Sequence, residues 1–185
     1  MNHEEHEGHE DPLFKTRGRG LSGSKLPTVF REGVRPEDCE SVRRIVSSSG
    51  FFSPEEVRVA VELVEERLNK GLESGYHFLF AEYDDHPVGY TCFGPIACTK
   101  ASYDLYWIAV IDELRNWGIG RELLTKSLQI IENLGGVRIY VETSSRPQYG
   151  PTRAFYSNHG FEIEAVLKDF YDRGDHKMIY VRTIE

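Results

Sequence analysis

The chain has 185 residues, of which 39% are hydrophobic and 28% charged. This balance is typical of one folded domain and not of a disordered chain. Its formal net charge is −8, from 22 basic and 30 acidic residues, which argues against a nucleic-acid partner because phosphate neutralisation needs clustered cations. No apolar run approaches the roughly 20 residues that cross a bilayer, and the first residues lack the basic and then apolar order of a signal peptide. We therefore expect no membrane partner and a cytoplasmic location.

Residues 1–27 are polar and glycine-rich, and we expect a flexible tail there, followed by a single domain over residues 28–185. His3, His6 and His9 are spaced three residues apart at the start of the tail, but they lack the folded frame that fixes metal ligands. The three cysteines are odd in number and have no CxxC spacing, so they indicate neither a disulfide framework nor a zinc site: Cys39, Cys92 and Cys98. The sequence therefore predicts no metal.

The first half of the domain predicts two helices among four strands. Residues 35–38 (RPED) favour the start of a helix that continues to about Ser48, because proline and acidic residues suit a first helical turn. Ser53 and Glu56 form a capping-box pattern at the start of a second helix, and Gly71 ends it. Aromatic and β-branched segments between turn signals predict the strands, which cover Thr28–Arg31, Tyr76–Tyr83, Val88–Phe93 and Tyr103–Val110.

The second half predicts a helix, a strand, a short helix and a terminal hairpin. An apolar stripe at helical spacing runs from Gly118 to Leu134. A strand covers Val137–Val141, and a short helix covers Pro151–His159. Two further strands flank the turn at residues 172–175, namely Phe161–Tyr171 and His176–Ile184.

The most informative segment is residues 115–121 (RNWGIGR), where a strand leads through a loop into a helix with two glycines. Backbone N–H groups at the start of a helix are unpaired and lie at the positive end of its dipole, so they can bind an anion. Gly118 and Gly120 would let a phosphate approach this backbone closely. The segment has neither the Gly-Lys-Ser/Thr ending of a P-loop nor the GxGxxG pattern of a Rossmann fold.

This segment, together with residues 154–161 (AFYSNHGF), resembles two motifs of the GNAT family of N-acetyltransferases: an R/Q-x-x-G-x-G/A loop and an A-x-x-F/L-Y-x-x-x-G-F segment. The resemblance covers roughly Thr28 to Ile184, and the element order agrees throughout. It implies an α/β (α+β) fold, with a mixed, mostly antiparallel twisted sheet of about seven strands flanked by about four helices. It also implies acetyl-CoA as the co-substrate.

The resemblance implies a coenzyme site along one strand and the loop after it. The pantetheine would pair with the strand backbone, and the pyrophosphate would lie on the N–H groups of the loop and first helical turn. Trp117 stands where the family often has a cation, and Asp112 where it often has proline. The implied coenzyme-binding residues are Ile108, Ala109, Val110, Arg115, Asn116, Trp117, Gly118, Ile119, Gly120 and Arg121.

The resemblance also implies two catalytic residues. Tyr156 takes the position of the family's general acid, and Glu142 matches a Glu proposed as base in ribosomal-protein N-terminal acetyltransferases. An unperturbed Glu, with a pKa of about 4.3, would need burial or a relaying water to deprotonate an amine. Glu82 and Asp104 are rival strand carboxylates. The loop over residues 146–149 departs from the family in length and composition, so the acceptor does not follow from the resemblance.

Three functions remain open at this point. The first is transfer of an acetyl group from acetyl-CoA to the primary amine of a small molecule, by direct attack in a ternary complex. The second is a protein N-terminal or lysine acetyltransferase acting on a peptide, and the third a non-catalytic domain that binds acetyl-CoA. Tyr156 argues against the third, because a sensor needs no proton donor. The sequence does not set the oligomeric state, and a homodimer stays open.

Overall fold

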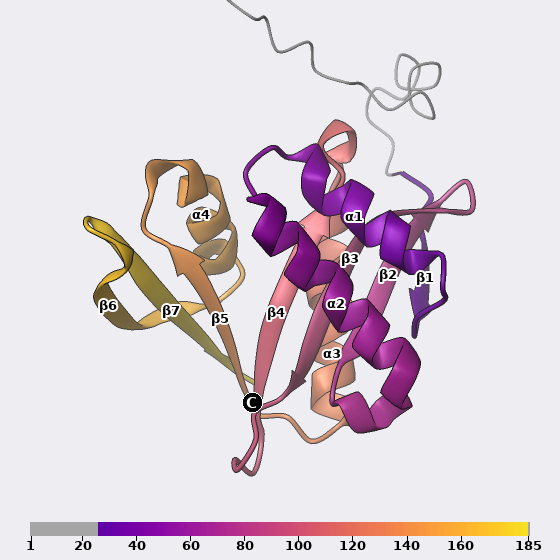
Figure 1. Cartoon of the computed structure of the whole chain (residues 1–185). Coiled ribbons are helices and arrows are strands. Elements are labelled where there is room, and N and C mark those ends of the chain that lie inside the picture. The colour runs from indigo at the N-terminus through magenta and orange to yellow at the C-terminus, as the bar shows by residue number, and fades with distance from the viewer. Residues whose placement is uncertain (1–25, 185) are drawn as a thin grey trace, which may run out of the picture.

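The computed structural model describes residues 26–184, which form one seven-stranded sheet with helices on both faces (Figure 1). The predicted fold class, a mostly antiparallel sheet of about seven strands flanked by four α-helices, is confirmed. The strands are β1 (Val29–Glu32), β2 (His77–Tyr83), β3 (His86–Pro95), β4 (Ser102–Val110), β5 (Arg138–Ser144), β6 (Glu162–Asp172) and β7 (Asp175–Thr183). The α-helices are α1 (Asp38–Ser48), α2 (Pro54–Lys70), α3 (Ile119–Asn133) and α4 (Gly150–Asn158).

The strands follow the order β1-β2-β3-β4-β5-β7-β6, and every neighbouring pair is antiparallel except β4 and β5. These two strands run parallel and pair only from Ser102 opposite Arg138 to Asp104 opposite Tyr140. Beyond that point they diverge, as Figure 1 shows. A bulge in β4, between its pairing with Cys92 and with Phe93 on β3, lies just past the last paired position.

Helix α2 begins and ends where its sequence predicts. Ser53 Oγ accepts a hydrogen bond from the Glu56 N–H, and the Glu56 carboxylate accepts one from the Ser53 N–H, which completes the capping box. The residue after the helix is Gly71, at a φ of 61°. Helix α1 instead begins without a side-chain cap. Its first residue, Asp38, is buried, and its Oδ1 lies 2.8 Å from Nη2 of Arg31, a residue of β1. An ion pair therefore joins this helix to the edge strand of the sheet.

Three short 3-10 helices were not predicted: η1 (Gly71–Ser74), η2 (Asp112–Leu114) and η3 (Pro147–Tyr149). The last two lie in the loops that enter α3 and α4. Strand β3 is also longer than predicted, because His86 and Pro87, expected in a turn, pair with β2. The turn is tighter than expected because Asp84 and Asp85 both take a positive φ.

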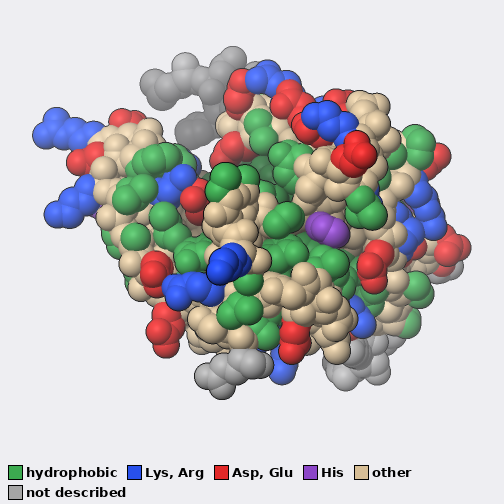
Figure 2. Space-filling model, turned by 90° about the horizontal axis from the view of Figure 1, so that it is seen from below, with side chains coloured by type: hydrophobic (Ala, Val, Ile, Leu, Met, Phe, Trp, Pro, Cys, Tyr) green, Lys and Arg blue, Asp and Glu red, His purple; other side chains and the backbone are tan. Residues whose placement is uncertain are grey.

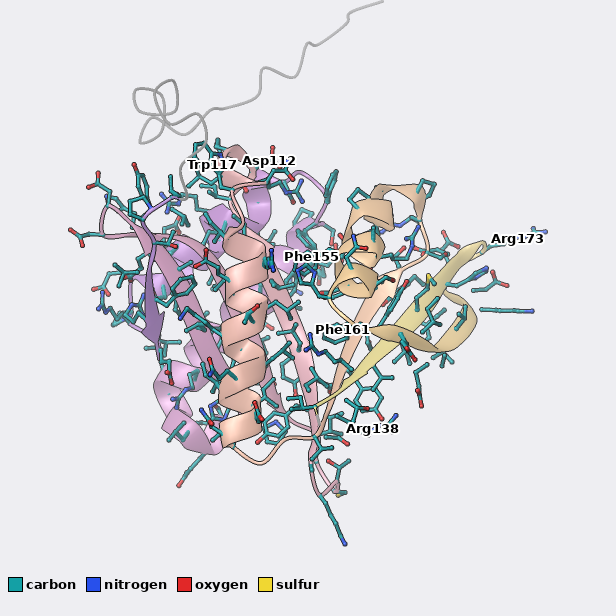
Figure 3. The ribbon with its side chains drawn as sticks, turned by 180° about the vertical axis from the view of Figure 1, so that it is seen from behind. Asp112, Trp117, Arg138, Phe155, Phe161 and Arg173 are labelled. Carbon is teal, nitrogen blue, oxygen red and sulfur yellow. The ribbon has the colours of Figure 1, made fainter. Side chains whose placement is uncertain are left out.

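The buried side chains form two clusters. The first cluster joins β2 and β3 to α1, α2 and the start of α3. The second joins β4, β5 and β7 to α3 and α4, and it includes Tyr156. Helices α1 and α2 cover one face of the sheet, whereas α3 covers the other (Figures 1 and 3).

Leu26 belongs to the packed domain although the sequence places it in the tail. Its side chain is only 4% exposed and lies in the first cluster. The rest of the predicted tail, except Pro27, lies outside the described residues, as do its histidines. Within residues 26–184, no helix is long and apolar enough to cross a membrane.

Candidate active site

A cavity of ≈ 1220 Å³ opens where β4 and β5 diverge. Its walls are β4, the start of α3, the end of β5, α4 and the segment between α1 and α2. The cavity brings together most of the residues that the sequence predicts for the site, which are Ile108, Ala109, Val110, Arg115, Asn116, Gly118, Ile119, Gly120, Arg121, Glu142 and Tyr156. Trp117 and the rival carboxylate Glu82 do not line it, whereas Asp104 does.

At its two glycines, Gly118 and Gly120, the loop presents backbone to the cavity. Gly118, at a φ of 85°, is the residue before α3, and no side chain caps the helix. The unpaired N–H groups of the first helical turn are therefore available to an anion. Ile119 is only 2% exposed, and its side chain is part of the first core cluster. A Cβ at Gly120 would lie 3.8 Å from Val110 and 3.9 Å from Phe155, which are ordinary contacts, so packing alone does not require glycine there.

The two residues that depart from the family pattern both have structural partners. Asp112 forms an ion pair with Arg115 at 2.9 Å, and its N–H donates a hydrogen bond to Ser48 Oγ on α1. Trp117 is half-buried against the first core cluster, and Figure 3 shows it beside Asp112, ahead of α3. Its ring packs against protein, and Trp117 does not line the cavity.

Tyr156 lies on α4 with its ring enclosed by aromatic neighbours. The ring centroid is 5.5 Å from that of Phe161, 5.6 Å from Phe155 and 6.2 Å from Tyr180. The residue is 5% exposed, and this burial raises the pKa of its phenol well above the ordinary value. The hydroxyl therefore keeps its proton at neutral and moderately alkaline pH.

Of the three candidate bases, two lie in the cavity. Glu82 is on β2, where its carboxylate binds Arg31 at 2.7 Å. Glu142 is 47% exposed, and its Oε2 lies 2.6 Å from Lys177 Nζ on β7. Asp104 is half-buried, and burial raises the pKa of its carboxyl; the charge of Glu142 raises that pKa further, whereas Lys177 lowers it. Asp104 and Glu142 thus remain as candidates.

Four tyrosines and a threonine also line the cavity, and of these the sequence pointed only to Tyr149, in the loop over residues 146–149. Burial, with a smaller contribution from Asp104, raises the pKa of Tyr106 to about 12. The tyrosines come from four separate elements, so no sequence spacing joins them: Tyr106, Tyr140, Tyr149 and Tyr171. The signal for Thr143 was its place beside Glu142 on a strand that ends at the cavity.

A second, smaller cavity of ≈ 290 Å³ lies at the other end of the strands, beside Arg67 and His77. Figure 2 shows this end of the molecule, where hydrophobic side chains are interspersed with charges of both signs. Burial and then the charge of Arg67 lower the pKa of His77. None of the predicted site residues lines this cavity.

Known acetyltransferases share the fold that forms this cavity. A family model described as acetyltransferase (GNAT) domain matches residues 74–163. No curated protein matches the chain. An aminoglycoside 6'-N-acetyltransferase from Enterococcus faecium shares the fold at 20% identity, with a TM-score of 0.68 over 85% of this chain and 97% of that one. The PaiA N-acetyltransferase from Thermoplasma acidophilum, solved with coenzyme A, does so at 19% identity, with a TM-score of 0.65 over 84% and 99%.

A much nearer relative is a Desulfovibrio desulfuricans protein assigned to the GNAT acetyltransferases. Its structure superposes with a TM-score of 0.84 over 85% of this chain and 99% of that chain. The two sequences are 48% identical. Identity at this level over nearly the whole domain shows more than a common fold: the chain belongs to the GNAT acetyltransferase family.

Proposed function

We propose that this protein transfers an acetyl group from acetyl-CoA to the primary amine of a small molecule. The observation that carries the proposal is the cavity itself. Among the described residues, it joins a helix N-terminus without a side-chain cap, a strand edge without a pairing partner and a buried tyrosine in one continuous space. These are the parts that a phosphate, a chain of amides and a departing thiolate would need.

Binding of acetyl-CoA would use mainly backbone groups. Beyond Asp104, β4 has no pairing partner on its β5 side among the described residues, so the pantetheine amides could pair with the backbone of Ile108 to Val110. The N–H groups of the first turn of α3 would hold the pyrophosphate, with Arg115 and Arg121 nearby. The coenzyme A seen in the Thermoplasma acidophilum relative supports this assignment.

Acetyl-CoA supplies an activated acetyl group, and the protein's residues handle the protons. The acceptor nitrogen would form a bond to the acetyl carbon as the carbon–sulfur bond breaks. Tyr156 would give its phenolic proton to the departing sulfur, and the proton that the attacking nitrogen loses as it becomes an amide would restore the phenol. The raised pKa of Tyr156 keeps that proton in place until it is needed.

Asp104 or Glu142, directly or through a water, would take the proton that an ammonium must lose before it attacks. Glu142 already holds Lys177, whereas no ion pair of Asp104 is recorded among the described residues. The environment of Asp104 also raises its pKa, which brings it closer to that of an amine. Both observations favour Asp104 as the base, with the charge of Glu142 raising its pKa.

A small cationic acceptor suits the remaining walls of the cavity. Carboxylates and aromatic rings together attract an amine that carries positive charge, and this end of the cavity offers Glu56, Asp104, Glu142 and the four tyrosines. Two proteins with the same fold are aminoglycoside 6'-acetyltransferases, and this agrees with a small polar amine as the acceptor. A peptide acceptor, as in protein N-terminal or lysine acetylation, is the alternative and would need room for an extended chain.

The test is a panel of amines in which release of free thiol from acetyl-CoA is followed. Small di- and polyamines should give turnover that peptides with a free N-terminus or lysine do not match. Turnover with peptides alone would replace the small-molecule acceptor by a protein. If acetyl-CoA bound but no amine were acetylated, the chain would be the non-catalytic binding domain.

A further inference from the structure

Thr143 on β5 lines the cavity, and its buried hydroxyl has no partner among the described residues. The residue is 7% exposed and lines the cavity. Among the described residues, no group hydrogen-bonds its Oγ1. Buried hydroxyls are nearly always hydrogen-bonded in folded proteins, and an exception at the wall of a binding cavity points to a ligand.

The strand alternation places this hydroxyl on a particular side of the sheet. Successive side chains of β5 point to opposite faces, and Val141 lies in the second core cluster with Tyr156. Thr143, two residues later, shares that face. Its neighbour Glu142 points to the other face, toward Lys177. The Thr143 side chain is thus on the face of the sheet that Tyr156 and α4 cover, and the carboxylate of Glu142 is on the opposite face.

We propose that the Thr143 hydroxyl hydrogen-bonds the pantetheine arm of acetyl-CoA and so helps to bind the acetyl donor. The inference rests on the proposed function, because it takes acetyl-CoA as the occupant of the cavity. A hydroxyl can donate to an amide carbonyl and accept from an amide N–H, and the pantetheine arm offers both. Thr143 lies where that arm would pass between β4 and the tyrosine, whereas the phosphates would lie at the glycine loop.

Two substitutions separate the hydroxyl from the shape of the side chain. Thr143→Val keeps the branched shape and removes the hydroxyl, whereas Thr143→Ser keeps the hydroxyl. Calorimetry should show the Kd of coenzyme A rising about 3- to 10-fold in Thr143→Val, the usual effect of one hydrogen bond. Thr143→Ser should bind coenzyme A nearly as the unchanged protein does. Adenosine 3′,5′-bisphosphate, which lacks the arm, should bind both variants and the unchanged protein equally.

Tyr90 supplies a matched control. Its hydroxyl is also buried without a partner among the described residues, but it does not line the cavity. Tyr90→Phe should leave the Kd of coenzyme A unchanged. An unchanged Kd in Thr143→Val, or an equal loss for both ligands, would overturn the assignment of Thr143. Absence of coenzyme A binding by the unchanged protein would overturn the proposed function itself, and this inference with it.

Discussion

Glu142 Oε2 lies 2.6 Å from Lys177 Nζ, across the β5–β7 pair. The Lys177 side chain is 15% exposed, and its Nζ lies 4.1 Å from the centroid of the Phe170 ring. A carboxylate held by a largely buried cation has less capacity to accept a proton from a substrate. This pair therefore shifts the role of base from Glu142, where the sequence favours it, toward Asp104.

Neutralising Asp104 should reduce activity more than neutralising Glu142. At neutral pH, Asp104→Asn should lower kcat/KM by about 10²-fold or more, the usual contribution of a general base. Its effect should shrink as pH rises, because the amine then deprotonates unaided. Glu142→Gln should cost less at neutral pH. Thiol release with an identified amine measures both, and a larger, pH-dependent loss in Glu142→Gln would return the base to Glu142.

The charges around Asp104 predict shifts of the pH profile in opposite directions. Glu142 raises the pKa of Asp104 and Lys177 lowers it. Glu142→Gln should therefore move the acidic limb of kcat/KM to lower pH, and Lys177→Met should move it to higher pH. Shifts in the same direction, or none, would show that the limb does not report Asp104.

Gly120 offers a cleaner test of the phosphate loop than Gly118. The positive φ of Gly118 strains any other residue, so its replacement mixes stability with binding. A Cβ at Gly120 meets only ordinary contacts, and Gly120→Ala should fold normally. We expect its Kd for coenzyme A to rise about 10-fold, the loss of a charge-assisted hydrogen bond. Gly150 is also a helical glycine, but it does not line the cavity. Gly150→Ala is therefore the matched control and should bind coenzyme A normally.

Local patterns in the sequence were sufficient for the seven strands, the four α-helices and the position of the glycine loop before α3. The capping box of α2 and the glycines at the start of α3 involve residues only a few positions apart in the sequence, so their spacing predicts them. The ion pair of Glu142 with Lys177 was beyond such reasoning, because the register of β5 against β7 brings together residues distant in sequence. The unpartnered hydroxyl of Thr143 was likewise hidden, since it depends on what every neighbour does or does not reach.

Leu26 is the first described residue and already lies in the first core cluster, although the polar composition around it predicts a tail. Leu26→Ala should lower the free energy of unfolding by about 2 kcal/mol or more, as usual for a buried leucine. Val29→Ala, at a side chain that is 67% exposed, should change it by less than about 0.5 kcal/mol. Denaturant titration measures both. Equal small effects would return Leu26 to the tail.

The sharpest prediction concerns Tyr156. Tyr156→Phe keeps the ring among Phe155, Phe161 and Tyr180 and removes only the hydroxyl. Thermal stability and the Kd of coenzyme A should therefore barely change. Turnover should fall by about 10²-fold or more, with KM similar, because the lost interaction is made in the transition state.

The pH dependence separates a proton donor from a packing residue. Burial holds the pKa of Tyr156 well above its ordinary value, so the acid stays protonated as pH rises, and turnover of the unchanged protein should not fall through moderately alkaline pH. Tyr180→Phe alters a neighbouring ring that is 6.2 Å away and does not line the cavity, and it should keep full turnover. If Tyr156→Phe also kept full turnover, in a reaction whose slow step is acetyl transfer and not product release, Tyr156 would be a packing residue and the acid would lie elsewhere.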